Sequence, residues 1–153
     1  NGLTHYFYGG SEATIGTLRE KLPKEYPHLK IAGMVSPPYR PLTKEEDAAK
    51  VEAMNASGAD IIWIGLGAPK QERYMYEHQG LTQGVMVGVG AGFDYYAGTI
   101  RRAPMWMQKL SLEWLYRLMQ DPKRLFKRYF VTNFKFLRLT LGRGKKSRGE
   151  KKS

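Results

Sequence analysis

Two short apolar segments of this chain both end in glycines, and this feature constrains the fold more than any other. The first segment, Ile61–Leu66, runs into Gly67, and the second, Val85–Val89, runs into Gly90 and Gly92. In an open α/β sheet, ligands bind at the carboxyl ends of the strands, where glycine lets the main chain come close to them. The pattern therefore predicts two strands whose ends form one wall of a ligand site.

Strands and helices alternate along the first two thirds of the chain. Ser11 stands where a helix N-cap is expected, and Thr43 and Glu46 have the spacing of a capping box. This alternation indicates an α/β fold, with a parallel sheet and helices on both of its faces. The predicted strands are His5–Tyr8, Leu29–Val35, Asp60–Leu66 and Val85–Val89, and the predicted helices are Glu12–Tyr26 (burying Ile15, Leu18 and Leu22), Lys44–Ala56 and Pro69–His78.

The pattern changes after Ala103-Pro104, where two helices follow each other without a strand between them. The first is predicted over Met105–Gln120, and Asp121-Pro122 ends it because the residue before a proline avoids helical geometry. The second is predicted over Lys123–Leu141. The apolar positions predicted to be buried in the first helix are Leu110, Trp114, Leu115 and Leu118, and those that form a stripe along the second are Phe126, Phe130, Phe134, Leu137 and Leu141.

The net charge of +11 belongs entirely to the C-terminal part. Residues 122–153 hold twelve lysines and arginines and one acid, whereas the first 121 residues are balanced. Such a segment suits an anionic surface, either phospholipid or nucleic acid. A basic amphipathic helix can lie among lipid headgroups, and no nucleic-acid-binding motif accompanies the charge. We therefore expect membrane contact ahead of a solvated helix packed on the domain, with nucleic acid last.

These patterns predict three parts. Residues 1–103 form a Rossmann-like α/β domain, residues 104–141 a basic amphipathic helical appendage, and residues 142–153 a disordered basic tail. The chain has no cysteine, which excludes disulfides and thiolate metal sites, and its three histidines are too far apart in sequence to suggest a metal site. No apolar run approaches the roughly 18 residues that a membrane-spanning helix needs.

Polar residues follow both glycine-rich strand ends. The stretch from Gly67 to Lys70 belongs to no dinucleotide fingerprint, but Pro69 is predicted to begin a helix whose free N–H groups suit a phosphate. A simple strand-to-helix turn explains the same glycines equally well. Gln71 offers a donor and an acceptor, which suits a sugar or a base, and Asp94 could do the same or cap the segment that follows. The residues by themselves indicate a binding surface without a complete catalytic apparatus.

Several short motifs occur in one order along most of the chain. They extend from Tyr8-Gly9-Gly10 through Ser36-Pro37-Pro38 to about Phe136. The most specific are Gly65–Glu72, Gly88–Asp94, Ala97-Gly98, Arg102-Ala103-Pro104 and Leu112–Leu118. In these motifs the chain resembles the WecG/TagA/CpsF family of bacterial glycosyltransferases.

The resemblance implies transfer of a hexose, such as N-acetylmannosamine, from a UDP-sugar to an undecaprenyl-diphosphate-linked saccharide. The products would enter teichoic acid, enterobacterial antigen or exopolysaccharide synthesis. A cytoplasmic protein, peripheral on the inner face of the cell membrane, is expected, with no cofactor, no metal and no nucleic-acid partner. The resemblance leaves open whether the protein forms a homo-oligomer. The alternative hypothesis is a non-catalytic module that binds a nucleotide or anionic lipid.

The resemblance also assigns roles to particular residues. Those that would line the donor pocket are Gly9, Gly10, Gly67, Gln71 and Asp94. Those that would reach the diphosphate of the donor or acceptor are Arg117, Arg124 and Arg128, because guanidinium groups suit phosphate oxygens. For Arg124 and Arg128, general attraction to anionic lipid is an equal alternative.

One departure from the family concerns the catalytic base. Family members carry an N-terminal half, with an aspartate proposed as the base, before the strand that begins here near Leu3. The resemblance therefore implies that this chain is the C-terminal portion of a longer enzyme. Its catalytic residue stays unknown, and we expect the chain alone to be inactive or nearly so.

Overall fold

The computed structural model describes residues 2–120 together with residues 122, 125, 130, 131, 134, 136, 138 and 140. The chain divides into two compact units, Asn1–Arg101 and Arg102–Ser153. The first unit contains a sheet between helices, and the described part of the second contains helices only.

The first unit is built on a parallel sheet in the order β2-β1-β3-β4. The inner strand β1 pairs with β2 on one side and with β3 on the other. Parallel pairing brings the carboxyl ends of the strands to one edge of the sheet, so the predicted α/β fold is confirmed. The strands are β1 (Thr4–Gly9), β2 (Lys30–Val35), β3 (Ile61–Gly65) and β4 (Val85–Gly88).

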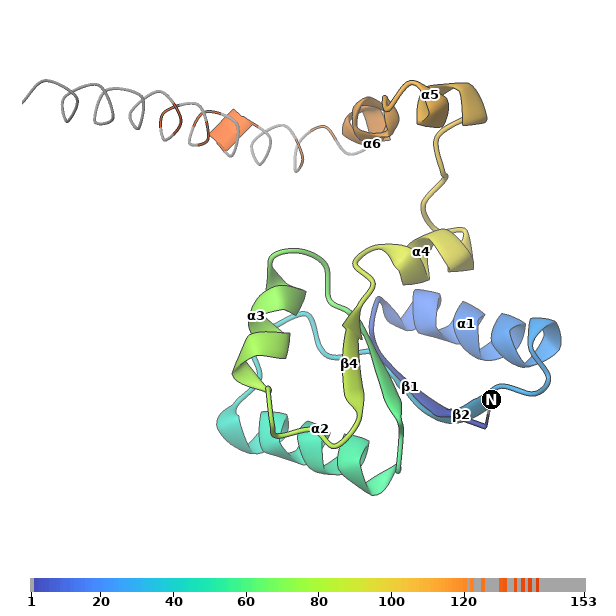
Figure 1. The fold of residues 1–153 in the computed structure, drawn as a ribbon, viewed down its shortest axis with the longest axis vertical. Helices are drawn as coiled ribbons and strands as arrows, with labels where there is room; N and C mark the ends of the chain where they lie inside the picture. The colour runs from blue at the N-terminus through green and yellow to red at the C-terminus, as the bar shows by residue number, and fades with distance from the viewer. Residues whose placement is uncertain are drawn as a thin grey trace, which may run out of the picture. The chain divides into compact units, whose positions relative to one another are not determined.

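Helices lie on both faces of this sheet. On one side are α1 (Glu12–Glu25) and α4 (Gly92–Ala97), and on the other are α2 (Lys44–Ala56) and α3 (Lys70–Glu77) (Figure 1). The three predicted helices form within two residues of their expected ends. The sequence does not predict α4, because six residues are too few to show a helical period.

The face beneath α2 and α3 is tightly closed. Tyr8, Ile62 and Ile64 are at most 1% exposed, and Met54 of α2 packs against them with 1% exposure. Burial, with a smaller effect of the nearby Asp47 carboxylate, raises the pKa of the Tyr8 phenol to about 12. These strand residues alternate with those on the opposite face, as the period of two in a strand requires.

The face beneath α1 and α4 is closed around Phe7. Ile15, Leu18 and Leu22 are at most 8% exposed and pack in one cluster with Phe7 and Phe93. The inner face predicted for the first helix is therefore confirmed. Burial of each side chain of this kind stabilises a fold by roughly 1.5–3 kcal/mol.

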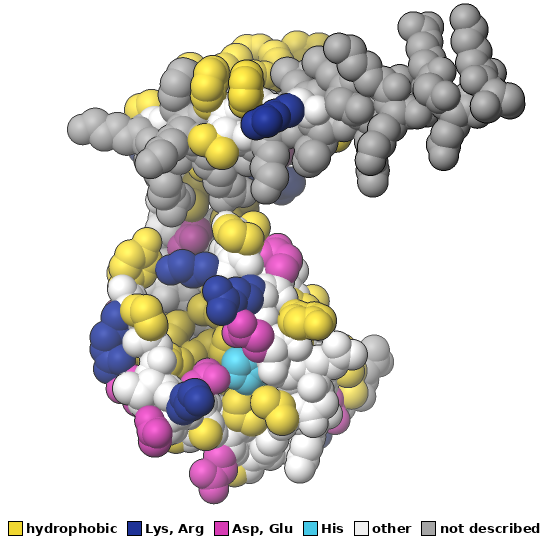
Figure 2. Space-filling view, turned by 90° about the vertical axis from the view of Figure 1, so that its left-hand side faces the viewer, with side chains coloured by type: hydrophobic (Ala, Val, Ile, Leu, Met, Phe, Trp, Pro, Cys, Tyr) yellow, Lys and Arg dark blue, Asp and Glu magenta, His cyan; other side chains and the backbone are white. Residues whose placement is uncertain are grey.

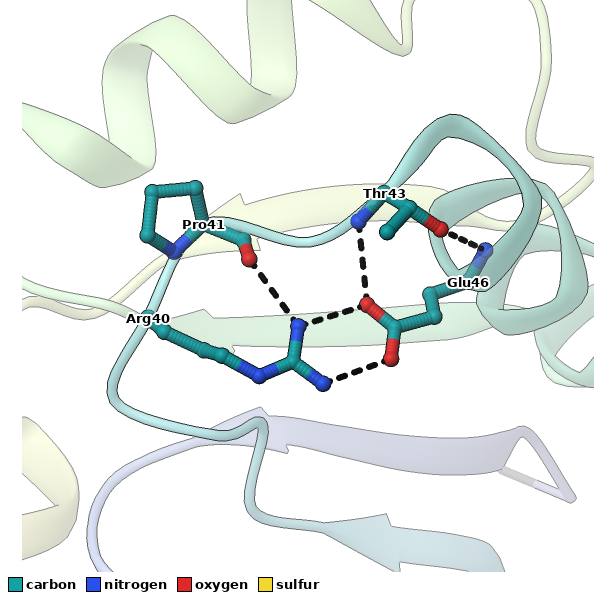
Figure 3. Close-up of polar contacts among 4 residues, drawn as sticks. All are labelled: Arg40, Pro41, Thr43 and Glu46. Atoms are coloured by element: carbon teal, nitrogen blue, oxygen red, sulfur yellow. Dashed lines mark hydrogen bonds and ion pairs between the residues drawn. The ribbon is translucent and has the colours of Figure 1, made fainter.

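A capping box starts α2, as the spacing of Thr43 and Glu46 predicts. The Thr43 hydroxyl accepts a hydrogen bond from the Glu46 N–H at 3.2 Å, and the Glu46 carboxylate accepts one from the Thr43 N–H at 2.9 Å (Figure 3). Arg40 donates two hydrogen bonds to the same carboxylate, from Nη1 to Oε2 at 2.7 Å and from Nη2 to Oε1 at 2.6 Å. These bonds, those from Arg40 foremost and then the one from Thr43, lower the pKa of Glu46 to about 2.

The second unit opens with two short helices, α5 (Met105–Lys109) and α6 (Glu113–Gln120). The prediction of one continuous helix from Met105 to Gln120 is therefore wrong. Ser111 adopts the left-handed conformation, with φ of 57°. Its N–H donates to the carbonyl of Gln108, and the next N–H, of Leu112, donates to that of Met107. This is the Schellman pattern, which ends a helix by satisfying its last carbonyls.

The second unit leaves much apolar surface exposed. It supplies nine of the fifteen large hydrophobic side chains that are exposed among the described residues. Leu110 and Trp114 are 63% and 51% exposed, so the prediction that they belong to a core is wrong. Phe130 and Phe134 are 65% and 63% exposed, and their rings stack with centroids 6.4 Å apart. The remaining members of the predicted stripe, Phe126, Leu137 and Leu141, lie outside the described residues.

Pro122 is itself helical, although Asp121-Pro122 is expected to separate two helices, and the described positions between 125 and 140 are all helical, as predicted for the second helix. Its predicted ends, Lys123 and Leu141, fall outside the described residues, as does the tail of residues 142–153. Across the part of the chain that the structure describes, every helix is too short or too polar to span a bilayer.

Candidate functional site

Hydrogen bonds around Gly10 join the carboxyl ends of three strands. The Gly10 N–H donates to the carbonyl of Gly65 at 2.9 Å, and the Ser36 hydroxyl donates to the carbonyl of Gly10 at 2.8 Å. The end of β4 is tied to β3 where the Val89 N–H donates to the carbonyl of Ile64 at 2.9 Å. The strand ends predicted to form one wall therefore lie together, with their loops held by direct contacts.

The glycines at this edge serve different purposes. A Cβ atom on Gly9 would lie 2.4 Å from the carbonyl carbon of Gly65, and one on Gly65 would lie 2.4 Å from the Phe93 ring. These two glycines are required for packing within the unit itself. A Cβ atom on Gly67 would meet nothing within 4 Å, although its φ of +73° favours glycine. Gly67 therefore leaves open space in front of α3, where a ligand has room to approach.

Gln71 spans the loops that follow β3 and β4. Its Oε1 accepts a hydrogen bond from the Gly90 N–H at 2.8 Å, and its Nε2 donates to the Glu72 carboxylate at 3.0 Å. Its own N–H donates to the carbonyl of Gly67 at 3.0 Å. The predicted residues Gly67 and Gln71 are thus brought together, and the amide of Gln71 is held against both glycine-rich loops.

Asp94 lies in the first turn of α4 and fastens that helix to α1. Its Oδ1 accepts hydrogen bonds from the hydroxyls of Thr14 at 2.8 Å and Thr99 at 3.3 Å. The Thr14 hydroxyl lies 2.9 Å from that of Ser11, the N-cap of α1. The N-cap of α4 is Ala91, so the alternative that Asp94 caps the following segment is wrong. The carboxylate is an acceptor with a fixed orientation at the carboxyl edge.

The sequence alone assigns no role to two further residues at this edge. Tyr39, in the loop after β2, is 97% exposed, and the Lys70 ammonium lies 5.0 Å from the centre of its ring. Lys70 is the first residue of α3. The edge therefore presents an aromatic ring and a cation beside the predicted residues. The signal for Tyr39 was its place directly after Ser36-Pro37-Pro38, a motif to which the sequence alone assigns no role.

The predicted arginines belong to the second unit. Arg117 lies in the last turn of α6. Arg124 and Arg128 lie outside the described residues. The predicted residues of the first unit therefore gather at one sheet edge, while the arginines come from a separate unit.

A separate groove of about 640 Å³ runs along α2. Figure 2 views the first unit from the side of α2 and α3, where a hollow with hydrophobic side chains and a histidine at its edge is visible. Val51 and Leu81 line the groove, and the buried His78 places Nε2 2.8 Å from the Asp47 carboxylate. None of the predicted site residues lines this groove. It is therefore distinct from the carboxyl edge of the sheet at Gly10, Gly65, Gly67 and Gly90, which we call the glycine edge.

The glycine edge carries several polar groups that are suited to binding a ligand. It offers the N-terminus of α3, the Lys70 ammonium and the Gln71 amide, which together suit an anionic ligand with hydroxyl groups. Asp94 already accepts two hydroxyl hydrogen bonds, which suits a positioned acceptor. Among the described residues, no group of three His, Asp or Glu side chains is placed to hold a metal ion.

Comparison with known proteins shows that the chain matches a known family. The model of the glycosyl transferase WecG/TagA/CpsF family matches residues 1–150. The N-acetylglucosaminyldiphosphoundecaprenol N-acetyl-beta-D-mannosaminyltransferase of Bacillus subtilis (strain 168) is 32% identical over 120 residues, which are 78% of this chain and 45% of that protein. The protein of the same name from Bacillus spizizenii matches with the same identity and coverage. The chain thus spans less than half the length of these relatives.

Proposed function

This chain belongs to the WecG/TagA/CpsF family of glycosyl transferases, and from this membership we propose that it forms part of an enzyme that transfers a hexose from a UDP-sugar to a polyprenyl-diphosphate-linked saccharide. The hexose is N-acetylmannosamine or a similar sugar, since both relatives are named as N-acetylmannosaminyltransferases. Their named acceptor, a diphosphoundecaprenol carrying N-acetylglucosamine, is the model for the lipid-linked acceptor. The product enters cell-surface polysaccharide synthesis.

The observation that carries this proposal is the joined glycine edge of the first unit. Gly10 bonds to Gly65, and Gln71 bonds across to Gly90, so the loops after three strands form one continuous surface. Ligands of open parallel sheets bind at this edge. Such a surface suits a nucleotide-sugar, because main-chain N–H groups at a helix N-terminus can bind its diphosphate.

We place the UDP-sugar at this edge. Its diphosphate lies over Gly67 and the N-terminus of α3, with the Lys70 ammonium beside it. The Gln71 amide donates hydrogen bonds to hydroxyl groups of the donor, and the Asp94 carboxylate accepts hydrogen bonds from them. Asp94 is supported for this role because Thr14 fixes its carboxylate at 2.8 Å. Gly9 and Gly10 lie beneath the donor, and the hydrogen bonds of Gly10 to Gly65 and Ser36 hold this turn against the neighbouring loops.

Arg117 is proposed to contact a diphosphate, with Arg124 and Arg128 as further contacts. A diphosphate leaving group gains negative charge as the glycosidic bond breaks. A guanidinium group aimed at it therefore stabilises the transition state more than the ground state. Arginine suits this role because its planar fork can bind two phosphate oxygens at once.

The second unit is proposed to bind the inner face of the cell membrane. Its exposed aromatic residues Phe130 and Phe134 supply apolar surface, and the twelve basic residues between positions 122 and 153 supply positive charge. Each basic residue near an anionic bilayer is worth on the order of 1 kcal/mol. This contact would bring the active site to its lipid-linked acceptor.

The catalytic base is proposed to lie in the part of the enzyme that this chain does not match. The relatives are more than twice as long as the matched segment. Within the described residues, Asp94 is engaged with Thr14 and Thr99 and serves binding in this proposal. The 153 residues alone are therefore expected to show little or no turnover.

A transfer assay on the complete enzyme tests the proposed function. Radiolabelled UDP-N-acetylmannosamine and a short-chain lipid-linked acceptor are supplied to the enzyme and to Gln71→Ala, and product formation is counted. We expect a loss of about tenfold or more, the equivalent of one hydrogen bond that is stronger in the transition state. The control is Gln79→Ala, an exposed glutamine just beyond α3. Equal turnover in all three proteins would contradict the proposed donor site.

A further inference from the structure

Part of the sheet is uncovered on the side of α1 and α4. His5, Ile61 and Val85 stand in register across β1, β3 and β4, and Trp63 and Val87 stand in register two residues later. Because side chains alternate along a strand, these residues share the face on which Phe7 packs against α1. We name these five residues the open face.

The two sides of β3 differ in exposure, and the neighbouring β4 begins with an exposed valine. Ile62 and Ile64, which point toward α2 and α3, are 1% and 0% exposed. Val85 on the open face is 66% exposed. The other four residues of the open face, from β1, β3 and β4, are only partly buried.

A parallel sheet is ordinarily covered on both faces, and its strands are apolar on both sides for that reason. α1 and α4 pack together and cover β1 and β2, where Phe7 is 7% exposed. Nothing in the described first unit covers Val85 and Val87 in the same way. An apolar area of this kind indicates a surface that is covered by another element.

We propose that the open face is the docking surface for an apolar helix from the part of the full-length protein that lies outside these 153 residues. The curated relatives provide the material for such a helix, since the chain spans 45% of their length. The inference concerns assembly of the fold and does not depend on the reaction proposed above.

The chemistry of the open face specifies the partner. Its one indole N–H, on Trp63, already donates to Nδ1 of His5 at 3.1 Å, and the two rings stack. Ile61, Val85 and Val87 present only hydrocarbon. The matching helix face is therefore aliphatic and uncharged. A second copy of the chain is a poorer fit, because a stable dimer interface takes roughly 20–30 residues from each side and the open face has five.

Thiol protection tests this docking directly, because the chain has no cysteine of its own. Val85→Cys places a thiol on the open face, and Tyr76→Cys places a control thiol on α3, where the tyrosine is 80% exposed. Reaction with a maleimide is timed in the 153-residue chain and in the complete protein, with any other cysteines replaced by serine. We expect both thiols to react at similar rates in the 153-residue chain.

In the complete protein, we expect the Val85→Cys thiol to react at least tenfold more slowly and the Tyr76→Cys thiol to keep its rate. Equal rates for Val85→Cys in both forms would overturn the proposal. Protection that grows with protein concentration would also overturn it, since a second copy would then be the occupant. Absence of any further coding sequence beyond these residues would overturn it as well.

A second variant keeps the test independent of thiol chemistry. Val85→Asp adds a charge at a position that is mostly exposed in the 153-residue chain, so its melting temperature there should stay within about 2 °C. In the complete protein the same charge would be buried against a helix, and we expect the melting temperature to fall by at least 5 °C. The same small change in both forms would contradict docking at this face.

Discussion

The two units of this chain use apolar residues in opposite ways. In the first unit, Ile15, Leu18 and Leu22 of α1 are at most 8% exposed. In the second unit, Trp114 and Phe130 are 51% and 65% exposed, although their sequence spacing is just as helical. Helical spacing therefore identifies an apolar face without revealing what will cover it. In the first unit that cover is the sheet, and in the second we propose that it is the membrane.

The prediction with the largest expected effect is that membrane binding depends on the second unit and not on the first. Deleting residues 122–153 removes the net positive charge and the Phe130–Phe134 pair, so co-sedimentation with vesicles of anionic lipid should be lost. The first unit should keep its far-ultraviolet circular dichroism and its melting temperature. Binding by the intact chain should weaken as salt rises, since salt screens surface charge. A truncated protein that still sediments with vesicles at moderate salt would show that the membrane proposal is wrong.

The second prediction compares one apolar residue from each unit, Ile64 and Trp114. Ile64→Ala empties a site that is 0% exposed, so the free energy of unfolding should fall by about 2–5 kcal/mol. Trp114→Ala removes a larger side chain that is 51% exposed, and we expect a loss under about 1 kcal/mol. Urea unfolding of both variants gives the two values. A loss for Trp114→Ala as large as that for Ile64→Ala would remove the contrast between the units.

The third prediction concerns how the first unit positions its site. Thr14→Val removes the hydroxyl that donates to Asp94 at 2.8 Å from a position that is 1% exposed. A lost bond to a charged group costs about 1–3 kcal/mol. Beyond stability, KM for the UDP-sugar in the complete enzyme should rise several-fold, because Asp94 is freed to turn away.

The matched control for Thr14 is Thr17→Val on the same helix, where the hydroxyl donates to the carbonyl of Ala13. It should leave KM unchanged. If both valine variants raise KM equally, the bond between Thr14 and Asp94 has no special part in donor binding.

The prediction with the smallest expected effect concerns the contribution of the exposed Glu46 carboxylate to the stability of the first unit. The pKa of Glu46 is lowered from 4.5 to about 2 by Arg40 and Thr43, so its stabilising effect is present above pH 4.5 and lost as the pH falls toward 2. Glu46→Gln should therefore lower the melting temperature at pH 6 and have almost no effect at pH 2. A difference between the two proteins that persists unchanged at pH 2 would argue against this pairing.

Most of the first unit was accessible from the sequence because its signals are local. The hydroxyl of Ser11 accepts the N–H of Thr14, and Thr43 and Glu46 form both bonds of the capping box. Such contacts depend on residues three positions apart, so spacing alone predicts them. The strands were accessible for the same reason, since each is a short apolar run closed by glycine or proline.

What the sequence did not predict depends on distant contacts or on rare conformations. The helix break at Ser111 requires a left-handed serine, which spacing gives no reason to expect. The link from Gln71 to Gly90 joins residues 19 positions apart, and that from Thr14 to Asp94 joins residues 80 apart. The candidate site was therefore predicted as a set of residues, but not as a network.

We propose that both units are needed for one reaction, to which the first contributes donor binding and the second contributes Arg117. The most direct measurement is turnover of the complete enzyme with a lipid-linked acceptor, for the unaltered protein, Arg117→Lys and Arg117→Ala. We predict that Arg117→Ala loses about tenfold to a hundredfold in turnover, the value of a charge-assisted hydrogen bond, while its melting temperature changes little. Arg117→Lys should recover only part of the loss. Turnover by Arg117→Ala equal to that of the unaltered enzyme would contradict the claim.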